Sequence, residues 1–185
     1  MDFGTTSDVI IALSNIAMAI AAVFAAYKAN DWLSERKHSN SFEYAIKLLT
    51  EFDELKSQQD RLHLDLLTLP LNHTSNIIKI DIERNVKKFT YDAVAFHRKV
   101  DNSIRYGISM KDNSIKEILA EISIYSNKSW EHVRFFQQDP SIIWAHKHFG
   151  KYIDQSLSLD ELWKDITLKH KALEKPVDDI FSFDH

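Results

Sequence analysis

The chain has 185 residues, enough for one domain, and its formal net charge of −4 gives it no overall basic field for binding nucleic acid. It contains no cysteine, which excludes disulfide frameworks, cysteine-ligated metal sites and thiol catalysis. Only three glycines and three prolines occur, too few for the many turns of a sandwich or barrel. The composition therefore favours an all-α protein built from long helices.

The N-terminal region holds a long stretch without charged residues. After a short tail at residues 1–8, residues 9–27 run for 19 positions without a charge. As a helix this stretch is roughly 28 Å long, close to the hydrocarbon thickness of a bilayer. The tail carries two aspartates and no Lys or Arg, unlike a secretory signal. We expect a transmembrane helix here, and the alternatives are a cleaved signal peptide and a buried alanine-rich helix.

The charges that flank this stretch predict its orientation. Lys28, Arg36 and Lys37 follow the stretch, whereas no Lys or Arg precedes it. The positive-inside rule therefore predicts a single span with the N-terminus outside and the chain from Lys28 onward in the cytoplasm. Residues 28–40 are then a juxtamembrane helix, with Trp32 at the membrane interface.

Small side chains recur every four residues in the predicted span. Ala17, Ala21 and Ala25 form a small-xxx-small pattern, which lets helix backbones approach closely in lipid. Asn15 lies in the same segment, where an amide gains from a hydrogen bond between helices. We expect these four residues to form the contact between spans of a homo-oligomer. The alternative is a simple anchor, because an alanine-rich helix also produces this spacing by chance.

Residues 41–175 predict a helical cytoplasmic domain that begins with two matched seams. The first seam, spaced alternately by three and four residues, is Ala45, Leu48, Phe52, Leu55, Gln59, Leu62, Leu66 and Leu69. The second seam is Ile82, Val86, Phe89, Ala93, Phe96, Val100 and Ile104. A short polar loop at residues 71–76 joins them, and this arrangement predicts an antiparallel helical hairpin.

Three further helix starts are indicated by local signals. These are a capping box from Ser114 to Glu117, an Asp139-Pro140 step with a helix to about Gly150, and a capping box from Ser158 to Glu161. No segment predicts a strand. The predicted fold is all-α, with one N-terminal transmembrane helix that continues into an antiparallel cytoplasmic bundle of about four to five helices.

The search for catalytic chemistry finds no site. The chain has no glycine-rich phosphate loop, HExxH motif or GxSxG motif. His146 and His148 are two residues apart, so on a helix they point to different sides and chelate poorly. Asp60 and His63 are interpreted as a surface pair, and His97 as a core histidine with a local partner. The sequence therefore predicts no enzyme, no cofactor, no metal and no nucleic-acid partner.

Two aromatic regions indicate contact surfaces. Trp130, Phe135 and Phe136 are too widely spread for one helix face, so the helix is either buried on two sides or meets a cytosolic partner protein. Residues 176–185 form an acidic and aromatic tail that contains Phe181 and Phe183. The tail either docks as the last strap of the bundle or is presented to another protein.

The layout resembles a widespread group of uncharacterised bacterial single-span membrane proteins with a helical cytoplasmic domain. Residues 9–27 and the Trp130-Glu131 step carry this resemblance. Some such proteins look like membrane effectors or accessories of anti-phage and CRISPR systems. The resemblance implies a self-assembling protein of the bacterial inner membrane that acts in phage defence by perturbing the bilayer. The alternative is a membrane-tethered adaptor whose bundle recruits a cytosolic protein.

Overall fold

The computed structural model describes residues 6–70, 75–137 and 146–183, without the side chains of residues 6–10, 12, 146–149 and 151. The described chain is mostly helical, which confirms the predicted all-α class. Its long helices are α1 (Thr6–Thr68), α2 (Asn76–Asn102), α3 (Ser114–Phe136) and α5 (His146–Lys171). The short elements are a 3-10 helix η1 (Ser103–Tyr106), β1 (Ile108–Met110), α6 (Val177–Ile180) and β2 (Phe181–Phe183).

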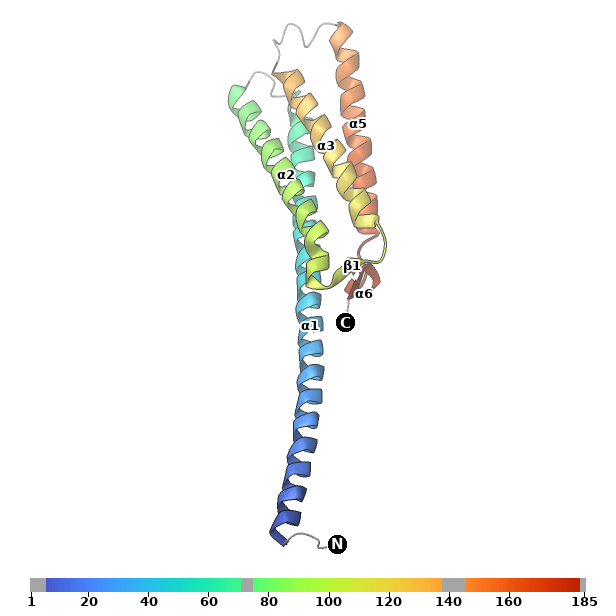
Figure 1. The fold of residues 1–185 in the computed structure, drawn as a ribbon. Coiled ribbons are helices and arrows are strands. Elements are labelled where there is room, and N and C mark those ends of the chain that lie inside the picture. The colour runs from blue at the N-terminus through green and yellow to red at the C-terminus, as the bar shows by residue number, and fades with distance from the viewer. Residues whose placement is uncertain (1–5, 71–74, 138–145, 184–185) are drawn as a thin grey trace.

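Helix α1 has two parts with different surroundings. It is one continuous helix of 63 residues, about 95 Å long at the usual rise per residue. Its C-terminal half packs with α2, α3 and α5 in a helical bundle, whereas its N-terminal half extends beyond the bundle (Figure 1). Every described side chain from residue 11 to residue 40 is exposed, and we call these residues the projecting segment.

The two predicted seams form the contact between α1 and α2. All eight members of the first seam are buried, none more than 3% exposed. The second seam is buried except for Ile104, which lies beyond the end of α2 in η1 and faces solvent. The rings of Phe52 and Phe96 stack across the hairpin with centroids 5.3 Å apart. The two helices run in opposite directions, as predicted (Figure 1).

One predicted helix start is confirmed, although its cap is a different residue, and one is wrong. Helix α3 begins at Ser114, but its cap is Asn113, and the Asp112 carboxylate accepts the Ser114 N–H at 2.8 Å. No helix starts at Ser158, because α5 runs without a break from His146 to Lys171 and the apparent capping box lies in its interior. Tertiary packing over the whole helix outweighs that local signal. The Asp139-Pro140 start lies outside the described residues.

The prediction that the chain has no strand was wrong at one place. β1 pairs antiparallel with β2, with Ile108 opposite Phe183 and Met110 opposite Phe181. Each strand has only three residues, too few for a visible alternation of polar and apolar positions. Gly107, with φ of 68°, ends η1 and turns the chain into β1, because glycine adopts this left-handed conformation without strain. The pair fastens the C-terminal segment to the bundle.

Among the residues that the structure describes, no helix combines the length and the apolar content of a membrane span. The structure thus gives no support to the transmembrane helix expected at residues 9–27, which stays a prediction.

Candidate functional site

The projecting segment carries the residues predicted to join neighbouring spans, and all of them are exposed. Its large apolar side chains are also 50–71% exposed: Ile11, Leu13, Ile16, Met18, Ile20, Val23, Phe24, Tyr27, Trp32 and Leu33. Isolated exposed apolar residues are common, but a continuous set of this size marks a surface that contacts lipid or another protein. The projecting segment is therefore the first candidate functional site.

The regular helix corrects the predicted oligomer contact. Asn15 and Ala17 are two residues apart, so they point to different sides of α1 and cannot share one helix contact. Asn15 is instead in line with Ala19, Ala22 and Ala26, which follow it at spacings of four, three and four residues. Ala21 and Ala25 follow Ala17 at spacings of four and lie on another side of the helix. The row from Asn15 to Ala26 is named the small-residue face.

The predicted partner surface is mostly interior. Phe135, Phe136 and Phe181 are buried, and Trp130 and Phe183 pack partly buried against the same core. Helix α3 contacts α2 on one side and α5 on the other, so it is buried on two sides. This leaves little of the predicted surface for a partner protein.

The C-terminal tail docks as a strap against α1. The Phe183 ring lies against His38 and Phe42, with centroids 5.4 and 5.9 Å apart, at the point where α1 leaves the bundle. The Ser109 and Ser182 hydroxyls are hydrogen-bonded at 2.6 Å across the β1–β2 pair. Of the two alternatives for the tail, the structure therefore shows the docked strap.

A group of polar residues crosses the interior of the bundle, and the sequence analysis missed it. We call it the polar layer; it consists of Lys56, Gln59, Asp60 and His63 on α1, Tyr125, Ser126, Ser129 and His132 on α3, and Asp160 and Trp163 on α5. Asp60 and His63 were interpreted as a surface pair, but His63 is buried. The sequence pattern does not reveal these contacts, because the partners of Asp60 and His63 come from helices about 60 and 100 residues further along the chain.

His63 connects three helices. Its Nδ1 is 3.2 Å from the Tyr125 hydroxyl, its Nε2 is 3.6 Å from an Asp160 oxygen, and its ring stacks on Trp163 with centroids 4.7 Å apart. Burial lowers the pKa of His63, an effect that the nearby Asp160 carboxylate only partly offsets. Burial also raises the pKa of Tyr125. Tyr125 is fully buried, so this Asp–His–Tyr series joins helices rather than presenting a nucleophile to a substrate.

A second set of contacts fastens α5 to α1. Trp163 Nε1 donates to an Asp60 oxygen at 2.7 Å, and the Lys56 ammonium donates to the same carboxylate. The Lys56 Nζ also lies over the Trp163 ring, 5.6 Å from its centroid. The buried ammonium is thus neutralised by its neighbour four residues along α1 and covered by an indole.

Two members of the polar layer have unmet hydrogen-bonding capacity. Gln59 is fully buried, and neither its amide nitrogen nor its amide oxygen has a partner within the described chain. His132 is 2% exposed, and its Nδ1 also lacks a partner there. Such groups are rare in protein interiors and cost stability. The polar layer is the second candidate functional site.

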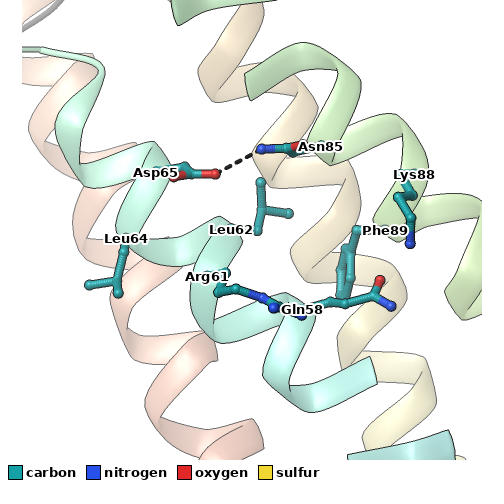
Figure 2. Close-up of a pocket in the computed structure, with 8 residues that line it drawn as sticks. All are labelled: Gln58, Arg61, Leu62, Leu64, Asp65, Asn85, Lys88 and Phe89. Atoms are coloured by element: carbon teal, nitrogen blue, oxygen red, sulfur yellow. Dashed lines mark hydrogen bonds between the residues drawn. The ribbon is translucent and has the colours of Figure 1, made fainter. Parts of the chain in front are cut away.

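A surface groove of about 420 Å³ lies between α1 and α2 (Figure 2). Its lining is Gln58, Arg61, Leu62, Leu64, Asp65, Asn85, Lys88 and Phe89. The Asn85 amide donates to Asp65 at 2.9 Å, and Lys88 pairs with Asp92 at 2.6 Å. Figure 2 shows Leu64 pointing away from the other side chains. With one of its two amides and one of its two cations engaged by carboxylates, the groove has no set of groups that selects one ligand class.

No group of three or more metal-ligand side chains is found in the part of the chain that the structure describes. The side chains of His146 and His148 lie outside that part. His97 is exposed, 3.6 Å from Asp101 on the next turn, so the expectation of a core histidine was wrong. Its position one residue past the seam turns it toward solvent.

Comparison of the chain with protein-family models, with curated proteins and with solved structures finds no match.

Proposed function

We propose that the protein is a membrane-anchored helical bundle whose projecting segment is the anchor. The observation that carries this proposal is the continuous exposure of large apolar side chains along residues 11–33. Apolar surface of this extent is unfavourable in water, and nothing in the described chain covers it. The uncharged stretch begins at Val9, ahead of the first described side chain at Ile11.

The charge pattern supports a lipid environment rather than a second layer of protein. A helix surface that packs on soluble protein normally leaves a charged face toward water. Residues 9–27 have no charge on any side, and charged residues return with Lys28 and Arg36. This order fits an outside N-terminus and a cytoplasmic bundle, as the positive-inside rule requires.

We also propose that the anchors self-associate through the small-residue face. Lipid gives helices no hydrophobic reason to associate, so close backbone packing and hydrogen bonds must supply the attraction. Ala19, Ala22 and Ala26 allow close approach, and Asn15 offers an amide to a second copy. An effector of phage defence at the bacterial inner membrane, acting by membrane perturbation, is the role that the layout resemblance implies for such an assembly.

The second candidate function is a tethered adaptor. It is favoured by exposed apolar side chains on the bundle itself, such as Ile77, Ile80, Tyr91 and Val94 along α2. In that case the projecting segment only holds the bundle at the membrane, and α2 contacts the cytosolic partner.

Membrane fractionation of cells tests the anchor. The full chain should stay with membranes after an alkaline carbonate wash. Ile20→Arg together with Phe24→Arg should shift it to the soluble fraction, because each Arg at the centre of a span costs roughly 2.5–3.5 kcal/mol of insertion free energy. Ile80→Arg is the matched control, since Ile80 is 56% exposed and Ile20 66%. A wild-type chain in the wash supernatant would contradict the anchor.

A further inference from the structure

The distal end of the bundle, where α1 ends and α5 begins, contains a histidine in an apolar setting (Figure 1). The His132 ring lies edge-on to Phe136 with centroids 5.2 Å apart, and 5.7 Å from the Tyr152 ring of α5. Phe135 stacks on the same Tyr152 at 6.2 Å. His132 is thus enclosed by aromatic rings from α3 and α5.

The His132 imidazole is within hydrogen-bonding reach of the Leu66 backbone. In an α-helix the Leu66 carbonyl would accept the N–H of the residue four positions later, but that residue is Pro70, which has no N–H. The Leu69 N–H donates to this carbonyl at 3.3 Å instead, and the imidazole adds a second hydrogen bond at the end of α1. Neutral imidazole has one N–H, which this bond uses, so Nδ1 is left as an acceptor without a partner.

Protonation would give His132 a second N–H and a positive charge. The N–H would have no acceptor within the described chain, and the charge would have no negative partner there. Among the described side chains, the titratable groups that face it are His63 from α1 and Tyr152 from α5, and neither is a carboxylate. On the α2 side, Glu83 accepts from Gln137, the residue that follows the end of α3. Burial is the largest influence on His132 and lowers its pKa to about 4.

His63, in the middle of the bundle, has a carboxylate beside it, unlike His132. Its Nε2 is 3.6 Å from an Asp160 oxygen and its ring lies on the Trp163 face, and Asp160 offsets part of the effect of burial, which still lowers the pKa of His63. The Lys164 ammonium, as the largest influence, lowers the pKa of Asp160, so this carboxylate stays charged in mild acid. Further along α5, His170 Nε2 lies 3.0 Å from an Asp53 oxygen, and Lys169 pairs with Glu121. Acid therefore weakens the distal attachment of α5 more than the attachment at His63, where Asp160 offsets part of the effect of burial.

We propose that the distal end is an acid-sensitive latch, in which protonation of His132 releases the first turns of α5 around Tyr152 while the rest of α5 stays attached. The open form binds the proton more tightly than the closed form, so falling pH favours opening. The loss of the closed form begins as pH drops through about 6.5, the value for a solvated histidine, and is complete near the folded value of about 4. The inference does not depend on the location of the projecting segment.

Hydrogen–deuterium exchange of the full chain tests the latch. Between pH 7 and pH 5, after correction for the chemical exchange rate, the protection of amides in residues 152–157 should fall on the order of 20-fold, as linkage predicts for this histidine. Amides in residues 163–169 should lose less protection than those in residues 152–157, because Asp160 offsets part of the burial effect at His63. Unchanged protection at 152–157, or an equal loss along α2 and all of α5, would overturn the proposal.

Two variants and one direct titration complete the test. His132→Gln keeps an N–H donor for the Leu66 carbonyl but cannot titrate, so it should abolish the pH dependence at residues 152–157. His97→Gln, at an exposed histidine, should leave that dependence as in the wild type. If His132→Gln does not fold, the ring signals of wild-type His132 decide by NMR. Titration of His132 near 6.5 with no change at Tyr152 would contradict the latch.

Discussion

The two halves of α1 belong to one continuous helix but differ in burial and in the distribution of charged residues. From Ala45 to Leu69, one residue in every three or four is buried, and charged residues occupy the other faces. From residue 11 to residue 33, the large apolar residues are exposed, and the first half of that stretch has no charge. The comparison shows that periodicity identifies a helix that is packed within its own chain. A helix without a polar side needs a cover from outside the chain.

The largest effect should come from truncating aromatic side chains in or against the packed half of α1, which runs from Ala45 to Leu69. Phe52→Ala or Phe89→Ala should lower the free energy of unfolding by about 3–5 kcal/mol, because both rings are fully enclosed. Chemical denaturation followed by circular dichroism measures the change. Phe24→Ala in the projecting segment is the control and should leave the unfolding of the bundle unchanged. A loss below about 1 kcal/mol at Phe52 would show that the seam does not form the core.

A smaller effect tests how α5 is joined to the packed half. Trp163→Phe keeps the stacked ring but removes the hydrogen bond to Asp60, so unfolding should become easier by about 1 kcal/mol, given the partial exposure of the carboxylate. Trp130→Phe, on α3, should cost less. Equal unfolding midpoints for wild type and Trp163→Phe would mean that the hydrogen bond from the indole N–H to Asp60 contributes no stability, because water bonds Asp60 equally well.

The packed half was predictable because its information is local. The spacing of the seam from Ala45 to Leu69 alone gives the helix and its buried face, and a matched seam in α2 gives the hairpin. The polar layer was not predictable, because His63 is satisfied by Tyr125 and Asp160 from distant helices. The β1–β2 pair was missed for the same reason. Local signals also misled, since the Ser158 capping box lies inside α5.

The projecting half is helical, its membrane span stays a prediction, and its predicted contact residues lie on two sides of the helix. Ala22→Leu with Ala26→Leu should reduce oligomer size in detergent, because the bulk separates backbones joined through the small-residue face, at a cost of about 1–2 kcal/mol. Ala17→Leu is the matched control on another side of the helix. Mass photometry distinguishes the outcomes, and loss of the oligomer in Ala17→Leu alone would place the contact on the other side.

The smallest effect concerns two glycines with opposite requirements. A Cβ at Gly150 meets nothing within 4 Å, so Gly150→Ala should stabilise α5 by about 0.5–1 kcal/mol through helix propensity. Gly107→Ala should destabilise the protein instead, because its φ of 68° is unfavourable for alanine. Denaturant midpoints for the two variants should move in opposite directions. Equal shifts would mean that the two backbone settings are not as described.

Cysteine labelling in cells tests the central claim most directly, because the natural chain has no cysteine to interfere. Single variants Asp2→Cys, Ala21→Cys and Ser34→Cys are treated with a maleimide that cannot cross the inner membrane. With an outside N-terminus and a spanning projecting segment, Asp2→Cys is labelled in intact cells whose outer layers are permeable, and Ser34→Cys only after lysis. Ala21→Cys should resist labelling until detergent is added. Labelling of Ala21→Cys in lysed cells without detergent, at the rate of Ser34→Cys, would contradict the membrane anchor.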